Sequence, residues 1–189
     1  MSQTMRFRSA DLEAFPDDGK RYEIIDGELY VSKQPSWEHQ RTCLVVGAEL
    51  LSWDRETGAG WTNAAPGVIF ADDDDVAPDI VWVSRERLRS IKGEGGRLYA
   101  APDLVVEVLS PGTSNEKRDR DAKLKLYSRR GVREYWIVNW MSRQVEVFRR
   151  EDLALHLVGT LLETDVLESP LLPGFRCPIA RLFQDIDAP

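Results

Sequence analysis

The sequence is poor in the side chains that build zinc sites and disulfide frameworks. Its 189 residues include only two cysteines and two histidines. Cys43 and Cys177 are far apart and lack metal-ligand spacing, which excludes a Cys/His zinc module and a disulfide-rich secreted fold. We therefore expect a cytoplasmic protein. A metal bound by this chain would be a hard cation held by oxygen ligands.

Long apolar runs are missing as well. No stretch approaches the ~20 residues that span a bilayer, and residues 1–15 lack the apolar core of a signal peptide. We expect no membrane partner. Hydrophobic residues make up 42% and charged residues 30% of the chain, as in ordinary globular proteins. The length suits a single domain over residues 1–189.

Positive charge is scarce, because the formal net charge is −7. This balance is unfavourable for a nucleic-acid-binding protein. Residues 115–133 are an exception, with eight basic and three acidic residues, a local charge of +5 against −12 elsewhere. Such a segment either contacts phosphates or forms a solvated helix face, and the charge pattern alone leaves both readings open.

The sequence patterns that are present predict one mixed α/β domain. In the N-terminal part we expect a short helical turn at 8–15 and a hairpin over 21–32 around Asp26 and Gly27. Ser36 is a plausible N-cap for a helix over 37–57. The apolar positions of this helix at helical spacing are Leu44, Ala48 and Leu51.

The remaining elements follow from apolar runs and turn residues. Thr113 and Glu116 form a capping-box pattern, and Gly131 ends the helix that they begin. Asp72 to Asp75 lack the glycine and glutamate of a calcium loop, so a solvated loop is favoured there. We expect strands at 67–71, 78–84, 102–111 and 132–140, a hairpin within 144–159, and an irregular tail after 171.

One strand contains an unexpected charge. In PDLVVEVLSP, residues 102–111, Glu107 lies within a run of leucine and valine that is typical of a strand covered on both faces. An ionised carboxylate in such a place costs several kcal/mol unless a cation or hydrogen-bond donors compensate it.

Asp79 is the candidate partner of Glu107. It opens the strand at 78–84, and pairing of the two strands would bring both carboxylates to one end of a sheet. A divalent cation between them would neutralise their repulsion and use their oxygens as ligands. A simple role for Asp79 at the start of a strand is equally compatible with the pattern.

Lys123 is the candidate cationic residue. On a helical wheel it shares a stripe with Asp119 and Tyr127, at the edge of the expected buried face, whereas Lys117 and Lys125 point outward. From this position it would reach back toward Glu107. The alternative is an Asp119–Lys123 surface ion pair worth a few tenths of a kcal/mol.

These residues in this order resemble the PD-(D/E)XK nuclease superfamily. RYEIIDGELY, PSWEHQ, PDIVWV, PDLVVEVLSP, KLKLY and GVREYWIV are more closely similar to the Uma-type family of predicted restriction endonucleases, over most of residues 21–183. The resemblance implies a restriction-endonuclease-like αβββαβ core with a central mixed sheet, and we add an N-terminal and a C-terminal β-hairpin.

The resemblance also implies roles for individual residues. Asp79, Glu107 and the backbone carbonyl of Val108 would bind Mg²⁺, for which Mn²⁺ can substitute. The lysine of the superfamily motif is absent, because Leu109 stands in its place. In the Uma-type pattern the lysine is relocated to the following helix, at Lys123, with Lys125 as the alternative.

Further residues are secondary candidates. Glu28, Glu38 and His39 could form a second part of the site, although solvated or capping roles suit them equally well. Lys117, Arg118 and Arg120 are the candidates for DNA contacts.

Two classes of function follow. The first is a Mg²⁺-dependent endonuclease that acts on DNA, expected to work as a homodimer. The alternative is a nuclease fold without turnover, kept as a nucleic-acid-binding or assembly module.

Overall fold

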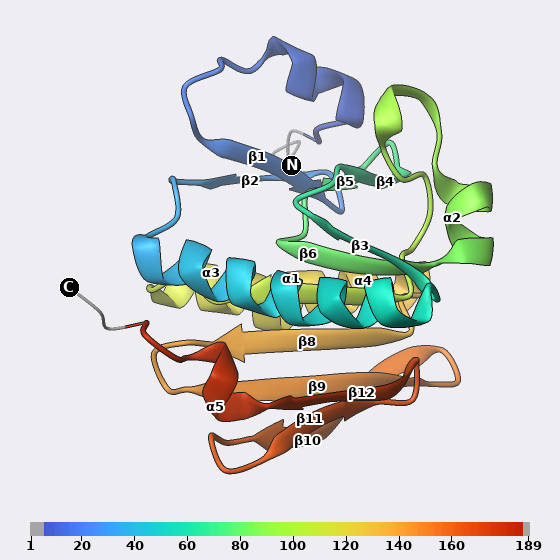
Figure 1. The fold of residues 1–189 in the computed structure, drawn as a ribbon. Helices are drawn as coiled ribbons and strands as arrows, with labels where there is room; N and C mark the ends of the chain where they lie inside the picture. The colour runs from blue at the N-terminus through green and yellow to red at the C-terminus, as the bar shows by residue number, and fades with distance from the viewer. Residues whose placement is uncertain (1–5, 187–189) are drawn as a thin grey trace.

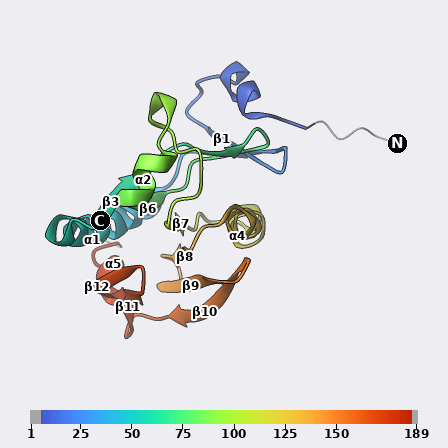
Figure 2. The same cartoon turned by 90° about the vertical axis from the view of Figure 1, so that its right-hand side faces the viewer.

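The computed structural model describes residues 6–186, and its centre is a six-stranded mixed sheet (Figures 1 and 2). The strands, in order across the sheet, are β10 (Ala154–Leu161), β9 (Gln144–Glu151), β8 (Glu134–Asn139), β7 (Leu104–Val108), β6 (Ile80–Ser84) and β3 (Gly60–Ala64). Only β7 and β8 are parallel neighbours in this sheet. All five residues of β7 are buried, as expected for a strand covered on both faces.

Helices cover both faces of this sheet. α1 (Trp37–Thr57) packs through Val46 and Leu50 against one face, which includes Val106 of β7. The opposite face packs against Leu126 and Tyr127. These two residues belong to a continuous helical segment made of α3 (Thr113–Lys117), the π-helical η3 (Arg118–Lys123) and α4 (Leu124–Arg130). The order α1, β3, β6, β7, helix, β8 is the expected αβββαβ core.

A second sheet is built on the N-terminal hairpin. Its strands, in order, are β2 (Glu28–Ser32), β1 (Arg21–Ile25), β5 (Asp74–Val76) and β4 (Val68–Ala71), all antiparallel. Asp26 and Gly27 both have positive φ angles, as a tight hairpin turn requires. The short 3₁₀-helix η1 (Ser9–Ala14) contacts β1, so the expected helical turn and hairpin are both present.

The remaining elements are not part of the central sheet and lie beside it or between its strands in the chain. A hairpin of β11 (Val166–Ser169) and β12 (Leu172–Pro178) and the short helix α5 (Ile179–Leu182) lie near α1 and β9 (Figure 1). α2 (Arg85–Ile91) and η2 (Glu94–Gly96) follow β6. No helix within residues 6–186 combines the length and apolar content needed to cross a membrane.

The strand assignments need three corrections. The strand expected at 67–71 is β4 of the second sheet, and the third core strand is β3, whose sequence GWTNA has no apolar run. The acidic segment at 72–78 is not a solvated loop, because β5 begins at Asp74 and its three residues are buried. The C-terminal tail is not irregular, because β11 and β12 pair there.

The helix assignments need one correction. α1 begins after Ser36, whose side chain accepts a hydrogen bond from the His39 N–H, as expected of an N-cap. However, Leu44 is 64% exposed and Leu51 38% exposed. α1 has two rows of apolar residues. The row of Leu44 and Leu51 was expected to pack against the sheet, but the row of Val46 and Leu50 does so instead. Spacing alone does not distinguish the two rows. The side chain of Thr113, in the expected capping box, lies outside what the structure describes.

Candidate metal-binding active site

The antiparallel strands β6 and β7 bring Asp79 and Glu107 together. Ile80 lies opposite Val106, so the next position outward places Asp79 opposite Glu107. Both side chains are buried, and both line one pocket of about 360 Å³. The N–H of Val108 donates to Asp79 Oδ2 at 2.9 Å. The structure thus brings together the two carboxylates that the sequence places on neighbouring strands.

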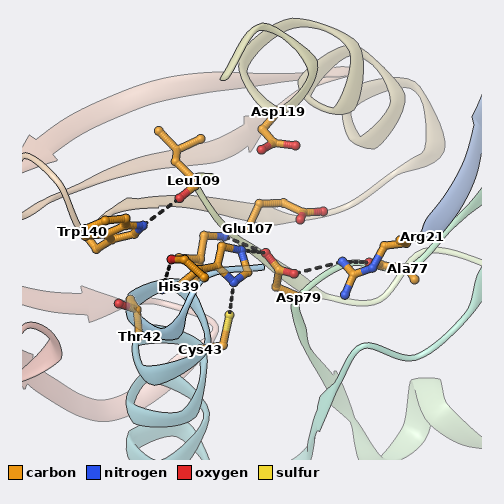
Figure 3. Close-up of polar contacts among 12 residues, drawn as sticks. Arg21, His39, Thr42, Cys43, Ala77, Asp79, Glu107, Leu109, Asp119 and Trp140 are labelled. Atoms are coloured by element: carbon orange, nitrogen blue, oxygen red, sulfur yellow. Dashed lines mark hydrogen bonds and ion pairs between the residues drawn. The ribbon is translucent and has the colours of Figure 1, made fainter. Parts of the chain in front are cut away.

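Side chains from α1 and β1 surround Asp79. Figure 3 shows the Asp79 carboxylate between Arg21 and His39. Arg21 donates to Asp79 Oδ1 at 3.0 Å and also to the carbonyl of Ala77. His39 Nε2 lies 3.3 Å from Asp79 Oδ2, and its Nδ1 lies 3.6 Å from Cys43 Sγ. Asp79 is therefore oriented by three separate elements.

Lys123 and Tyr127 hold Glu107 from the interior. Lys123 Nζ donates to Glu107 Oε1 at 2.9 Å, and the Tyr127 hydroxyl donates to the same oxygen at 2.6 Å. Glu23 and Asp119 lie 3.2 and 3.8 Å from the same ammonium. Lys123 is 0% exposed, so the alternative of a surface ion pair with Asp119 is wrong.

The two oxygens of Glu107 have different surroundings. Within the described part of the chain, both hydrogen bonds to this carboxylate go to Oε1. No buried side-chain nitrogen or oxygen of these residues lacks a partner. Glu107 also lines the pocket, so this side chain borders the space in which a ligand would lie. Oε1 is thus the oxygen that anchors the side chain.

The surroundings shift the pKa of Glu107 upward. Burial is the main cause, and the charges of Asp79, Asp119 and Glu23 add to it, so the pKa rises to about 8 although Lys123 opposes the shift. Burial would lower the pKa of Lys123, but the charges of Glu107, Glu23 and Asp119 outweigh it and raise the pKa. Lys123 consequently keeps its proton at neutral pH.

The pKa of Asp79 is shifted the other way. Burial would raise it, but the hydrogen bond and charge of His39, with Lys123 and Arg21, lower it well below its ordinary value. Asp79 therefore stays ionised. Burial raises the pKa of the Cys43 thiol, with contributions from Asp79 and Glu107, so this thiol stays protonated and is a poor metal ligand.

The secondary acids expected from the sequence lie elsewhere. Glu28 is exposed on β2, where it accepts a hydrogen bond from the Tyr30 hydroxyl and lines a different pocket. Glu38 lies on the first turn of α1, and the Ser36 hydroxyl lowers its pKa by a hydrogen bond. Neither side chain lines the pocket of Asp79 and Glu107, whereas His39 does.

The candidates for DNA contacts also differ in position. Arg118 lines the pocket and pairs with Asp119 at 2.9 Å. Lys117 is exposed and lines the separate pocket that contains Glu28, and Arg120 pairs with Glu146 of β9. The basic segment thus contributes one cation to the site pocket.

The N-terminal hairpin contributes residues that the sequence reasoning missed. Glu23 of β1 contacts Lys123, and Lys20, Arg21 and Lys33 line the site pocket. A usable signal was present, because Glu23 precedes two isoleucines in RYEII, which repeats the pattern of an acid within an apolar strand. The basic residues gave no such signal, since exposed lysines are common.

The donor atoms of this pocket suit a divalent ion. Glu107 lines the pocket, and the ligand atoms of Asp79, His39 and Cys43 lie within 4.8 Å of one another. Carboxylate oxygens with one imidazole nitrogen are donors that Mg²⁺, Mn²⁺ and related ions accept. With Glu107 ionised as well, the four buried acids Asp79, Glu107, Glu23 and Asp119 exceed the three cations Lys123, Arg118 and Arg21 by one charge.

Comparison with known proteins agrees with this fold. A putative nuclease of the DUF820 group from Anabaena variabilis superimposes with a TM-score of 0.77 at 18% identity, covering 95% of this chain and 99% of that one. The type IIG restriction endonuclease BpuSI matches with a TM-score of 0.46 at 13% identity, over 82% of this chain and 17% of that one. No curated protein matches this sequence.

The mixed sheet, with one acid on β7 and another directly before its neighbour β6, has a restriction-endonuclease-like fold. The family model described as putative restriction endonuclease, Uma2, matches residues 9–180. The chain belongs to the Uma2 family.

Proposed function

We propose that this protein is a divalent-metal-dependent endonuclease that hydrolyses phosphodiester bonds in DNA. The observation that carries the proposal is the pair Asp79, directly before β6, and Glu107 on the neighbouring β7, which are buried yet line one pocket with basic residues at its rim. Such an arrangement costs stability without a cation, and it is the arrangement that metal-assisted hydrolysis needs. Family membership supports the same activity.

Asp79, Glu107 and His39 are the residues that would hold the ion, with the Val108 carbonyl as a further ligand. Mg²⁺ is the expected ion and Mn²⁺ a substitute, for which the imidazole of His39 is a suitable additional ligand. When bound, a divalent ion lowers the pKa of a coordinated water and polarises the scissile phosphate.

The protein side chains supply position and charge. Arg21 and the Val108 N–H orient the carboxylate of Asp79. Lys123 and Tyr127 hold Oε1 of Glu107, and Oε2 would be the oxygen offered to the ion. Because Lys123 keeps its proton, we assign it the role of a cation that offsets negative charge at the site, not that of a base.

Basic residues at the pocket rim would contact phosphates. Arg118 lines the pocket from η3, and Lys20 and Lys33 line it from the flanks of the N-terminal hairpin, so a phosphate would meet cations from two parts of the chain. A two-fold homodimer would allow both strands of a duplex to be cut, and this remains a prediction.

The test is DNA cleavage with Mg²⁺ or Mn²⁺ by the wild-type protein and matched variants. We expect Asp79→Asn to abolish cleavage and Asp72→Asn, at an exposed position before β5, to leave it unchanged. Lys123→Met should lower the rate by about two orders of magnitude or more, whereas Lys125→Met should not. A wild-type protein that binds DNA without cutting it would support the alternative of a binding module.

A further inference from the structure

Glu23 is a buried acid that the proposed mechanism does not yet use. It lies on β1, in the N-terminal hairpin and outside the αβββαβ core, and only 1% of its surface is exposed. Its Oε1 accepts a hydrogen bond from the Ala77 N–H at 3.0 Å and lies 3.2 Å from Lys123 Nζ. Ala77 directly precedes Pro78 and Asp79, so Glu23 is tied to the segment that leads into the site.

The ammonium of Lys123 is held from two sides. Glu107 contacts it from the central sheet and Glu23 from the N-terminal sheet, while Asp119, one helical turn before it, is more distant at 3.8 Å. Glu107 has a second task, because it is also a candidate metal ligand. Glu23 does not line the pocket of Asp79 and Glu107, so its contact with Lys123 remains available when Glu107 binds an ion.

We propose that Glu23 is a positioning residue of the nuclease site, which fixes the Lys123 ammonium beside Glu107 in the metal-loaded protein. The inference rests on the proposed function. Glu23 acts through Lys123 and touches neither metal nor DNA. The hairpin is therefore part of the working site, although it lies outside the αβββαβ core.

The test compares Glu23→Gln with Glu28→Gln, an exposed acid on the same hairpin. Glu23→Gln keeps the shape of the side chain and an oxygen for the Ala77 N–H, but it removes the charge that holds Lys123. We expect kcat to fall about 10- to 100-fold, with KM for DNA and the Kd for Mn²⁺ changed less than about threefold. Glu28→Gln should match the wild type in all three quantities.

Two further measurements separate positioning from folding and from metal binding. Glu23→Asp keeps the charge but shortens the reach, and it should show the same selective loss of kcat at a temperature well below its Tm. A normal kcat in either folded variant would overturn the proposal. A parallel loss of Mn²⁺ affinity would also overturn it, because it would make Glu23 a metal ligand.

The role of Glu23 is also testable without turnover. The ¹³Cε signal of Lys123 in lysine-labelled, Mg²⁺-saturated protein, assigned with Lys123→Met, should shift in Glu23→Gln and stay unchanged in Glu28→Gln. An unchanged signal in Glu23→Gln contradicts the positioning role even if the wild-type protein cuts no DNA. Absence of cleavage by the wild type, with the expected shift, would reject the nuclease activity alone.

Discussion

At Glu107 a carboxylate occupies a strand whose other residues are apolar and buried. The structure shows what compensates it: Lys123 and Tyr127 donate to Oε1, and Glu107 lines a pocket. The compensation is incomplete in the metal-free protein, because burial and neighbouring acids raise the pKa of Glu107 to about 8. The position of the Glu107 carboxylate within the sheet is explained by a role as ligand to a bound cation, and not by a contribution to the stability of the fold.

The raised pKa of Glu107 predicts a pH-dependent metal affinity. The folded-state pKa is above the ordinary value of 4.5, so this group contributes stability below pH 4.5 that is lost as the pH rises through about 8. A metal must displace the bound proton. We expect Mn²⁺ affinity to rise about tenfold per pH unit up to about pH 8 and then to level off.

Calorimetric titration with Mn²⁺ at several pH values measures this dependence. Repeating it in buffers of different ionisation enthalpy gives the number of protons released, which should approach one below about pH 7. Glu107→Gln, which has no proton to release at this position, should lose the dependence. An affinity of the wild type that is flat across this range would show that Glu107 is not a ligand.

Among the structural elements, the N-terminal sheet is fastened to the helix that carries Lys123. Asp74 of β5 is fully buried and accepts hydrogen bonds from Arg129 and Arg130 of α4 and from the Asp26 N–H. The two arginines are about one-third exposed, which weakens each pair relative to a fully buried one. This cluster fixes the hairpin of Glu23 relative to Lys123.

Asp74→Asn should therefore destabilise the protein. Removal of the buried charge leaves Arg129 with only Asp26 and Arg130 with only the more distant Asp73 as carboxylate partners, and we expect the free energy of unfolding to fall by about 1–2 kcal/mol. Urea unfolding measures this change, with Asp72→Asn as the control at an exposed position. A loss below about 0.5 kcal/mol would mean that the cluster does not fasten the two sheets.

The elements also show which parts of the molecule the sequence could predict. Strong local signals located β1 and β2, α1, β6, β7 and β8, because turn residues, caps and apolar runs act over a few neighbouring residues. β3 and β5 were not recognised, since GWTNA and DDV become strands only through pairing with β6 and with β1 and β4. Glu23 was overlooked because its partner Lys123 is 100 positions away in the chain.

On the scale of the whole molecule, several basic residues are gathered around one pocket. The net charge of −7 opposes DNA binding, but Lys20, Arg21, Lys33 and Arg118 gather at the pocket of Asp79 and Glu107. Three of these cations come from the N-terminal hairpin and its flanks. The two parts of the molecule thus contribute differently to the pocket: Glu107 of β7 and Asp79 before β6 supply its acids, and the N-terminal hairpin with its flanks supplies three of these four cations.

The central claim is that Asp79 and Glu107 are a metal site, and the most direct test is anomalous scattering from crystals of the wild-type protein soaked in Mn²⁺. We predict a strong peak in the pocket within about 2.0–2.3 Å of one oxygen of each carboxylate, and none there in Asp79→Asn. A well-measured wild-type map without a peak between Asp79 and Glu107, or with manganese bound only elsewhere, would contradict the account.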